Sequence, residues 1–294
     1  MKQRNFEVWL ADAQKRRMEF LRTDPNCFSG NRRERLQYLQ YLDKKDVELT
    51  DFQYDACVGL CLSDASLQSG TASPQEPEKT FTRLKMTQAT KHESFVYHVK
   101  DVLRIYTGNE NPLRPLSSRS QIYEFQTFRC KQFTPLADVF SDEPPQTDGV
   151  VPKKVTEKRK PFITPVSVAY WFCGDGGKAD FTSNKGKGIS FHTQFFSKEE
   201  CKLLASFLRD NLGLDAVAKL DVRSQNQFRV DVLGPSYDKF IEIVGPYIHP
   251  SMVFKLPTPR TTGSRFGYAD AAFFENNGGV FFKNEDYLSK YSRF

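Results

Sequence analysis

The stretch SVAYWFCGDGGK at residues 167–178 is an apolar run that ends abruptly in a carboxylate, two glycines and a lysine. A second stretch, YDACVGLCLSDA at residues 54–65, has the same form. Each run has the length of about three helical turns, which is too short to cross a bilayer. If both runs are helices, Asp64 and Asp175 stand at helix C-termini, where the helix dipole disfavours a carboxylate by about 0.3–1 kcal/mol. A divalent cation is the simplest partner that would hold such carboxylates in place.

A lone apolar run that ends in Asp is an ordinary turn signal, because Asp opens turns and caps the next element. Two such runs with matching sequence downstream favour a functional origin. MTQATK at residues 86–91 precedes one predicted helix, and HTQFFSK at residues 192–198 precedes another. Both halves follow the order helix, strands, helix, strands, helix. The sequence therefore predicts a duplicated unit of roughly a hundred residues, with a pseudo-two-fold relation between the copies.

The spacing of apolar residues predicts the elements of each copy. In the first half we expect a loop at residues 70–79. We expect strands at 81–88 and 121–128, and helices at 91–105 and 133–140. In the second half we expect a strand at residues 188–194 and a helix at 197–212. A pair of strands follows at 215–221 and 227–232, and a closing helix at 237–247. Thr50 is a predicted N-cap, Ser197 opens a predicted capping box, and the glycines after Asp175, Gly176 and Gly177, suit a left-handed helix stop.

Composition sets the class of protein. The chain has 294 residues with 39% hydrophobic side chains and 26 Phe, enough for a packed core in one large or two compact domains. Its net charge of +6 is compatible with a polyanionic partner. Six Cys and four His without a CxxC pair argue against a structural zinc site and fit a reducing compartment. Neither a secretory signal nor a membrane span is visible, so no membrane partner is expected.

Small residues on both apolar runs would let the two helices approach closely, and these are Gly59, Ser63, Ala169 and Gly174. Asp64 and Asp175 then converge. Two carboxylates at such a distance repel each other, and one is protonated unless cations neutralise them. Divalent ions shared between the two carboxylates would form a centre for phosphoryl transfer.

The alternating strands predict a sheet in each half, and a β-ribbon fits the major groove of DNA. The candidate nucleic-acid-binding residues on these strands are Arg83, Lys85, Thr87, Gln121, Tyr123, Lys185, Lys187, Lys219, Arg223, Gln225, Gln227 and Arg229. Three further basic candidates are Lys153, Lys154 and Lys178. A plain solvated face is the alternative interpretation of each position.

The two runs resemble the paired motifs of LAGLIDADG homing endonucleases, in the monomeric, double-motif, intron-encoded branch. The resemblance covers about residues 50–257. It is most specific in the second half, where five short motifs occur in the order of the family: TP at 164–165, AYWF at 169–172, DGGK at 175–178, TQ at 193–194 and KLP at 255–257.

The resemblance implies an α+β fold of two pseudo-symmetric αββαββα repeats, which form a saddle of antiparallel sheets. A basic helical N-terminal extension precedes the two repeats in the sequence. The predicted division of the chain is an extension at 1–48, a first repeat at 49–145, a linker at 146–163, a second repeat at 164–257 and a tail at 258–294.

The resemblance also implies site-specific cleavage of double-stranded DNA by a monomer with Mg²⁺, for which Mn²⁺ can substitute. The catalytic residues that it implies are Asp64, Asp175, Lys255 and Lys85. The metal centre that it implies comprises Asp64 and Asp175 with the adjoining Ala65 and Gly174. Lys255 matches the basic residue expected near the second motif, and its first-half counterpart is open among Lys153, Lys154 and Lys85.

A function of another class is the alternative. Proteins of this family also act as intron maturases, and the fold can serve as a scaffold that binds a structured RNA, including ribosomal RNA, without nuclease activity. The basic N-terminal extension favours this alternative. The family context predicts an organellar protein, with the mitochondrion ahead of the chloroplast.

Overall fold

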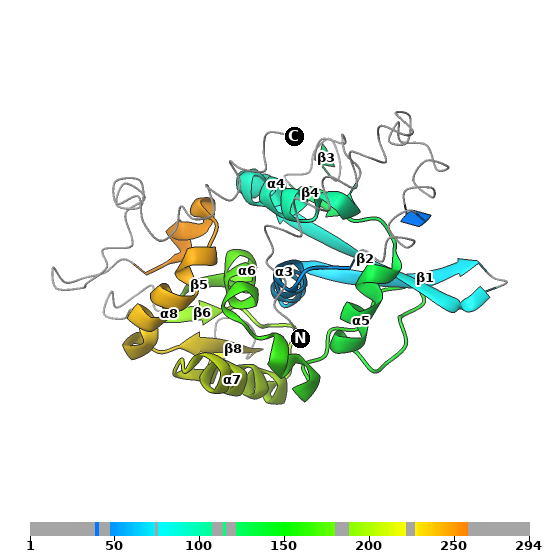
Figure 1. The fold of residues 1–294 in the computed structure, drawn as a ribbon. Helices are drawn as coiled ribbons and strands as arrows, with labels where there is room; N and C mark the ends of the chain where they lie inside the picture. The colour runs from blue at the N-terminus through cyan, green and yellow to red at the C-terminus, as the bar shows by residue number, and fades with distance from the viewer. Residues whose placement is uncertain are drawn as a thin grey trace. The chain divides into compact units, whose positions relative to one another are not determined.

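The computed structural model describes residues 39–40, 48–73, 76–107, 114–115, 122–179, 188–221 and 227–257 (Figure 1). Most of the predicted N-terminal extension and the whole predicted tail lie outside these residues. So do five candidate residues, Gln121, Lys185, Lys187, Arg223 and Gln225. The described residues form two compact units, one from those up to 54 with those in 65–152 and one from residues 55–64 with those from 153 onward. Residues 55–64, nearly all of the apolar run at 54–65, therefore belong with the second half of the chain.

The first unit contains a four-stranded antiparallel sheet in the order β1-β2-β4-β3. Its strands are β1 (Ala65–Ser73), β2 (Glu76–Ala89), β3 (Arg114–Pro115) and β4 (Ile122–Gln126). Its α-helices are α4 (Glu93–Val102) and α5 (Thr134–Phe140), with 3₁₀ turns η1 (Thr90–His92), η2 (Arg104–Tyr106) and η3 (Lys131–Phe133). The predicted strands and helices are confirmed, but the predicted loop at 70–79 was wrong. Residues on both sides of 74–75 belong to a β1–β2 hairpin, whose polar sequence hides the strand pattern.

The second unit repeats this topology, with a sheet in the order β5-β6-β8-β7. Its strands are β5 (Gly176–Lys178), β6 (Ile189–Phe191), β7 (Ala216–Asp221) and β8 (Gln227–Val232). Its α-helices are α6 (Pro165–Asp175), α7 (Lys198–Leu212) and α8 (Tyr237–Ile243), with 3₁₀ turns η4 (Glu157–Phe162), η5 (Gly234–Ser236), η6 (Gly245–Tyr247) and η7 (Pro250–Lys255). With α3 (Asp51–Cys61) ahead of β1, both repeats follow the predicted αββαββα order.

Local sequence explains where the main helices begin. Thr50 Oγ1 accepts from Gln53 N at 3.1 Å, while Gln53 Oε1 accepts from Thr50 N at 3.2 Å. Thr164 with Ser167 and Ser197 with Glu200 form the same reciprocal capping box at α6 and α7. Such a cap typically stabilises a helix by about 1 kcal/mol.

The helix stop predicted at Gly176 was wrong. Gly176 has φ −75° and ψ 155°, and the chain passes directly from α6 into β5. Glycine is required there for space, since a Cβ would lie 2.6 Å from Phe172 Cγ. A left-handed stop occurs instead at Gly213 after α7, where φ is 60°.

Helix α6 is buried along most of its length, from Val166 to Cys173. Its Trp171 stacks on Phe191 of β6 with ring centroids 4.1 Å apart, and Phe172 meets Phe240 of α8 edge to face at 5.7 Å. A helix that is apolar on all sides needs such a position in the core. Asp175 therefore ends a helix that neighbouring elements hold firmly.

The predicted linker is packed against the units rather than free in solvent. Val151 N donates to Leu67 O at 2.9 Å in the first unit, and Val155 N donates to Glu200 Oε1 at 2.9 Å in the second. Arg159 in η4 is completely buried. Among the described helices, none combines the length and apolar character needed to cross a membrane.

Candidate active site

The second half of α3 packs against α6 at very short range (Figure 1). A Cβ on Gly59 would lie 2.8 Å from Tyr170 Cβ and still closer to Ser167 O. A Cβ on Gly174 would lie 2.5 Å from Ser63 Cβ. Near the opposite ends of the two helices, Thr164 Oγ1 donates to Asp55 Oδ2 at 2.8 Å. The predicted close approach at Gly59, Ser63 and Gly174 is confirmed.

This packing brings Asp64 and Asp175 together. The Asp64 carboxylate lies against Gly174, since Oδ2 is 3.1 Å from where a Gly174 Cβ would stand. Burial, followed by the negative charge of Asp64, raises the pKa of Asp175 to about 7. Two half-buried carboxylates near helix C-termini repel each other at an electrostatic cost, which is the situation expected of a cation site.

One lysine lies at the end of each Asp-bearing segment. Lys255 Nζ donates to Cys173 O at 2.7 Å and also to Gly174 O. Lys153 Nζ donates to Ser63 O at 2.7 Å. Both ammonium groups act to lower the pKa of Asp175, against the larger effects that raise it. Lys153 thus stands to the first motif as Lys255 stands to the second, an equivalence that the sequence left open.

Lys153 is itself half-buried, and burial lowers its pKa while Cys61, Asp175 and Asp64 oppose that change. The buried Arg159 contributes further positive charge near Cys61, and burial lowers the pKa of Arg159 to about 9. Burial also raises the pKa of the Cys61 thiol to about 12, so Cys61 is neutral at physiological pH. Sequence reasoning missed Arg159, because the run KRK at 158–160 has the composition of a solvated linker.

The donor set suits Mg²⁺ better than a softer metal. Within the described ranges, no cluster of three or more His, Cys, Asp or Glu side chains is placed to hold a metal ion. Mg²⁺ is commonly bound by one or two carboxylates completed by substrate phosphate oxygens and water. Of the two adjoining candidates, Ala65 pairs with Met86 at the start of β1, and Gly174 O accepts from Lys255.

On the first sheet, three candidates share the face opposite the buried Leu84 and Met86. Arg83 donates twice to Gln68 Oε1, at 3.0 and 2.7 Å. Lys85 forms an ion pair with Glu124 of β4 at 2.8 Å. The third candidate is Thr87, which lies directly across from Glu124 in the register of β2 and β4.

The exposed-face prediction was wrong for Tyr123. Tyr123 pairs with Gln88, two positions from the Met86–Phe125 pair, and so shares the face of these buried residues. Partial desolvation, followed by Glu93 and Tyr97 of α4, raises the pKa of Tyr123. The side chains of β4 thus alternate with the opposite parity to the predicted one.

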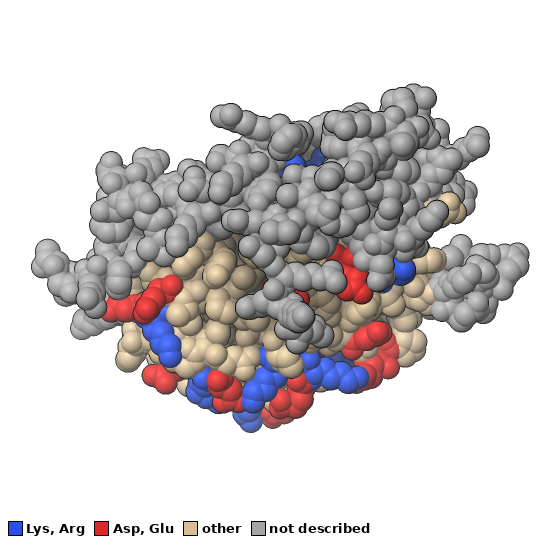
Figure 2. Space-filling view, in the orientation of Figure 1, with Lys and Arg blue, Asp and Glu red and all other residues tan. Residues whose placement is uncertain are grey.

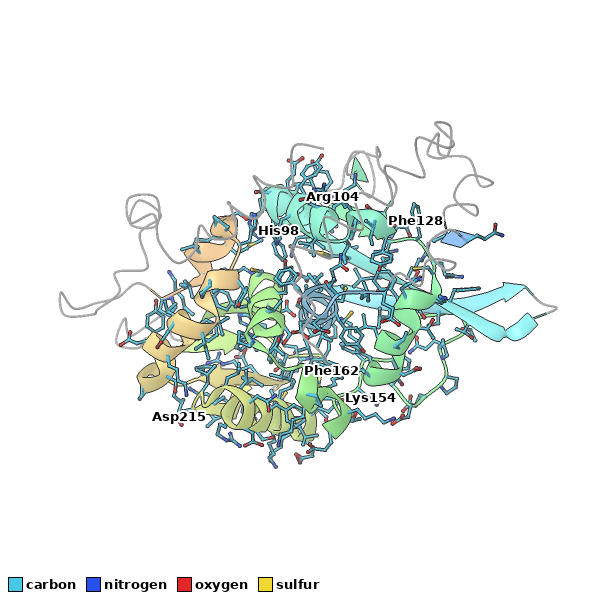
Figure 3. The ribbon with its side chains drawn as sticks, viewed as in Figure 1. His98, Arg104, Phe128, Lys154, Phe162 and Asp215 are labelled. Atoms are coloured by element: carbon cyan, nitrogen blue, oxygen red, sulfur yellow. The ribbon has the colours of Figure 1, made fainter. Side chains whose placement is uncertain are left out.

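On the second sheet, Lys219, Gln227 and Arg229 share one face, opposite the buried Val230 and Val232. Lys178 pairs with the buried Ile189 and so has the parity of the helix-covered face. Lys154 is exposed, and its charge acts on Glu200 in the first turn of α7 (Figure 3).

Charges on the helix side are balanced rather than segregated. Lys160 pairs with Asp210 at 2.6 Å, and Lys202 pairs with Glu199 at 3.2 Å. Figure 2 shows basic and acidic side chains interspersed over the described part of the visible face. Such a surface offers phosphates little net attraction, so the sheet faces are the better candidates for a nucleic-acid interface.

Gly59→Ala is expected to lower the free energy of unfolding by about 1–3 kcal/mol, because the new methyl group meets backbone and Cβ atoms that cannot yield. Chemical denaturation with two spectroscopic probes measures this. Gly177→Ala is the matched control, since its Cβ would be 3.3 Å from the movable end of His192. Equal effects of the two substitutions would contradict the close helix packing.

Known proteins match this chain over much of its length. A model of the LAGLIDADG DNA endonuclease family matches residues 54–240. Probable intron-encoded endonuclease 1 of Wickerhamomyces canadensis is 30% identical over 171 residues, which cover 56% of this chain and 70% of the relative. Probable intron-encoded DNA endonuclease 3 of Mycosarcoma maydis is 29% identical over 136 residues, which cover 46% of this chain and 93% of the relative.

A solved structure shares the fold. The homing endonuclease I-WcaI bound to its DNA recognition sequence matches with a TM-score of 0.63 and 24% identity. The match covers 78% of this chain and 94% of that structure's chain. The resemblance and the α+β fold class inferred from the two motifs are both confirmed.

Proposed function

We propose that this chain, which belongs to the LAGLIDADG DNA endonuclease family, is a site-specific endonuclease that hydrolyses phosphodiester bonds in double-stranded DNA. One observation carries the proposal. Asp64 and Asp175 meet near the ends of two tightly packed helices, and each Asp-bearing segment has a lysine on its terminal carbonyls. Two crowded acids flanked by two ammonium groups fit the requirements of phosphoryl transfer, in which charge must be neutralised around a phosphate.

The acids Asp64 and Asp175 would hold Mg²⁺, with Mn²⁺ able to substitute. When bound, the divalent metal supplies an activated water and stabilises the leaving oxygen. Lys153 and Lys255 hold positive charge beside the acids, where negative charge accumulates on the phosphate. Their hydrogen bonds to helix-end carbonyls fix these ammonium groups in position before DNA binds. We assign the first-half basic role to Lys153, and Lys85 stays a candidate for contact with DNA only.

One chain supplies both acids and both lysines, so we propose that it acts as a monomer on one DNA duplex. The sheet faces that carry Arg83 and Lys85 in one repeat, and Lys219 and Arg229 in the other, are the proposed DNA-reading surfaces. The names of the relatives describe them as intron-encoded. We therefore propose an organellar location, the mitochondrion ahead of the chloroplast.

A cleavage selection tests the proposal. The purified chain is incubated with a randomised duplex library and Mg²⁺, and the new ends are sequenced. We expect one long asymmetric target, cut in both strands, and no cutting in EDTA. A folded protein that cuts no member of the library would contradict the proposal. The remaining interpretation would then be a maturase-like or ribosome-associated protein that binds structured RNA, which sequencing of co-purified RNA would identify.

A further inference from the structure

Two acids and two basic residues meet on the sheet face that lies opposite the α7 side of the second repeat. Lys219 of β7 stands directly across from Arg229 of β8, with Asp221 and Asp231 on the same face. Arg229 Nε lies 2.9 Å from Asp231 Oδ1, and Arg229 Nη2 donates at 3.2 Å to Asp231 Oδ2 and to Ala179 O. Asp221 Oδ2 is 3.8 Å from Arg229 Nη1. The guanidinium is thus held on two sides.

This arrangement differs from a phosphate-binding surface. Asp221 and Asp231 are only 7% and 3% exposed, and their charges balance those of Arg229 and Lys219. Phosphate binding depends on an excess of positive charge, which this cluster does not supply. The cluster instead fixes the orientation of the planar Arg229 guanidinium. The conformational entropy of this side chain is therefore lost when the protein folds and not when it binds.

A fixed guanidinium suits a base edge. Asp231 contacts the Nε and Nη2 atoms, whereas the Nη1 donors lie beyond hydrogen-bond distance of Asp221. Guanine presents O6 and N7 acceptors in the major groove, whereas adenine has an N6 donor in place of the O6 acceptor. The Nη1 donors of Arg229 therefore match the acceptor edge of guanine, while Asp231, which is 3% exposed, stays with the guanidinium.

We propose that Arg229 is a specificity-determining residue that reads the guanine of one G·C pair in the DNA target, and that Asp231 is its positioning residue. The inference rests on the proposed function, because it requires that this sheet face meets DNA. It goes further by assigning one base pair to one held side chain. A purely structural ion pair would stabilise the sheet without changing the preference for any base.

A binding selection in EDTA separates the two roles, since binding is then measured without cleavage. The wild-type target is first defined, and affinities for all single-base variants of it are measured for wild type, Arg229→Lys and Asp231→Asn. Arg229→Lys keeps the charge but loses the planar donor array. We expect it to lose about tenfold to a hundredfold of the preference for guanine at one base pair. Asp231→Asn should weaken the preference at the same base pair to a smaller extent, because the guanidinium loses its charged support.

Lys219→Ala is the comparison variant, because Lys219 faces Arg229 across the strands, its side chain is 61% exposed, and its Nζ lies only 4.0 Å from Asp231 Oδ2. It should weaken binding to all sequences about equally, because it removes one positive charge from the sheet face without changing the guanidinium. Circular dichroism confirms folding of each variant, and Asp231→Asn decides alone where Arg229→Lys does not fold. Unchanged base preferences, or equal losses at every position, would overturn the inference. A wild-type protein that selects no sequence would instead overturn the proposed function.

Discussion

Asp175→Asn is expected to abolish cutting of both strands and, at the same time, to stabilise the metal-free protein. An amide is a weak ligand for a hard divalent cation, so single-turnover cleavage should fall by about a thousandfold or more, in the range of other losses of electrostatic stabilisation. DNA binding should persist, because the proposed reading surfaces lie on the sheets. Asp64→Asn should behave alike, since both acids contribute to one crowded centre.

The gain in stability follows from the raised pKa of Asp175. Burial and Asp64 raise this pKa from its ordinary 3.8 to about 7. The folded state therefore holds the proton more tightly than the unfolded state. Stability from this group is fully present below pH 4 and is lost as the pH rises through about 7. Asn stays neutral and avoids that loss, so the variant should exceed wild type by about 1–3 kcal/mol at pH 8, a value reduced by partial solvent screening.

Thermal unfolding in EDTA between pH 4.5 and 8.5 measures this difference, which should shrink toward the acid end. Asp215→Asn is the control, because Asp215 is exposed just before β7 (Figure 3). Its stability should stay within about 0.5 kcal/mol of wild type at every pH. Added Mg²⁺ should raise the melting temperature of wild type and not of Asp175→Asn. Cleavage at the wild-type rate by Asp175→Asn would refute the catalytic assignment, and equal stability at pH 8 would refute the electrostatic crowding.

The acids could be predicted because their signal is local. A carboxylate at the end of an apolar helix is visible in the sequence, and the duplication identifies both copies. The capping residues Thr50 and Ser197 are local in the same way. Gly176 has a local signal with two meanings, since glycine serves both a left-handed stop and a crowded contact, and only the position of Phe172 distinguishes them.

The remaining features depend on tertiary contacts that no local pattern contains. Lys153 Nζ reaches Ser63 O across 90 positions of sequence, and the route depends on how residues 146–163 pack. Lys85 is another first-half candidate in the sequence, yet it forms an ion pair with Glu124 of the same sheet. The face of Tyr123 depends on the β2–β4 register, and a shift of one residue reverses the face of every side chain.

Lys153→Met and Lys255→Met are each expected to slow the cleavage of one DNA strand more than the other. The strand that is slowed more should differ between the two variants. Each lysine donates to the carbonyls of a different Asp-bearing segment, so each should serve mainly the phosphate nearest that segment. Methionine keeps the length of the side chain but removes the charge. Loss of one such electrostatic group typically slows the step that it serves by about a hundredfold to a thousandfold. The other strand should be affected less, so that nicked duplex accumulates.

Single-turnover cleavage of a duplex labelled separately on each strand gives the two rates. We expect the slow strand to switch between Lys153→Met and Lys255→Met, an outcome that general destabilisation would not produce because it would slow both strands together. Lys85→Met is the matched control and should change DNA affinity while leaving both rates intact at saturating enzyme. If Lys85→Met instead produces nicked DNA and Lys153→Met does not, the first-half basic residue is Lys85. The hydrogen bond of Lys153 to Ser63 O then has only a structural role.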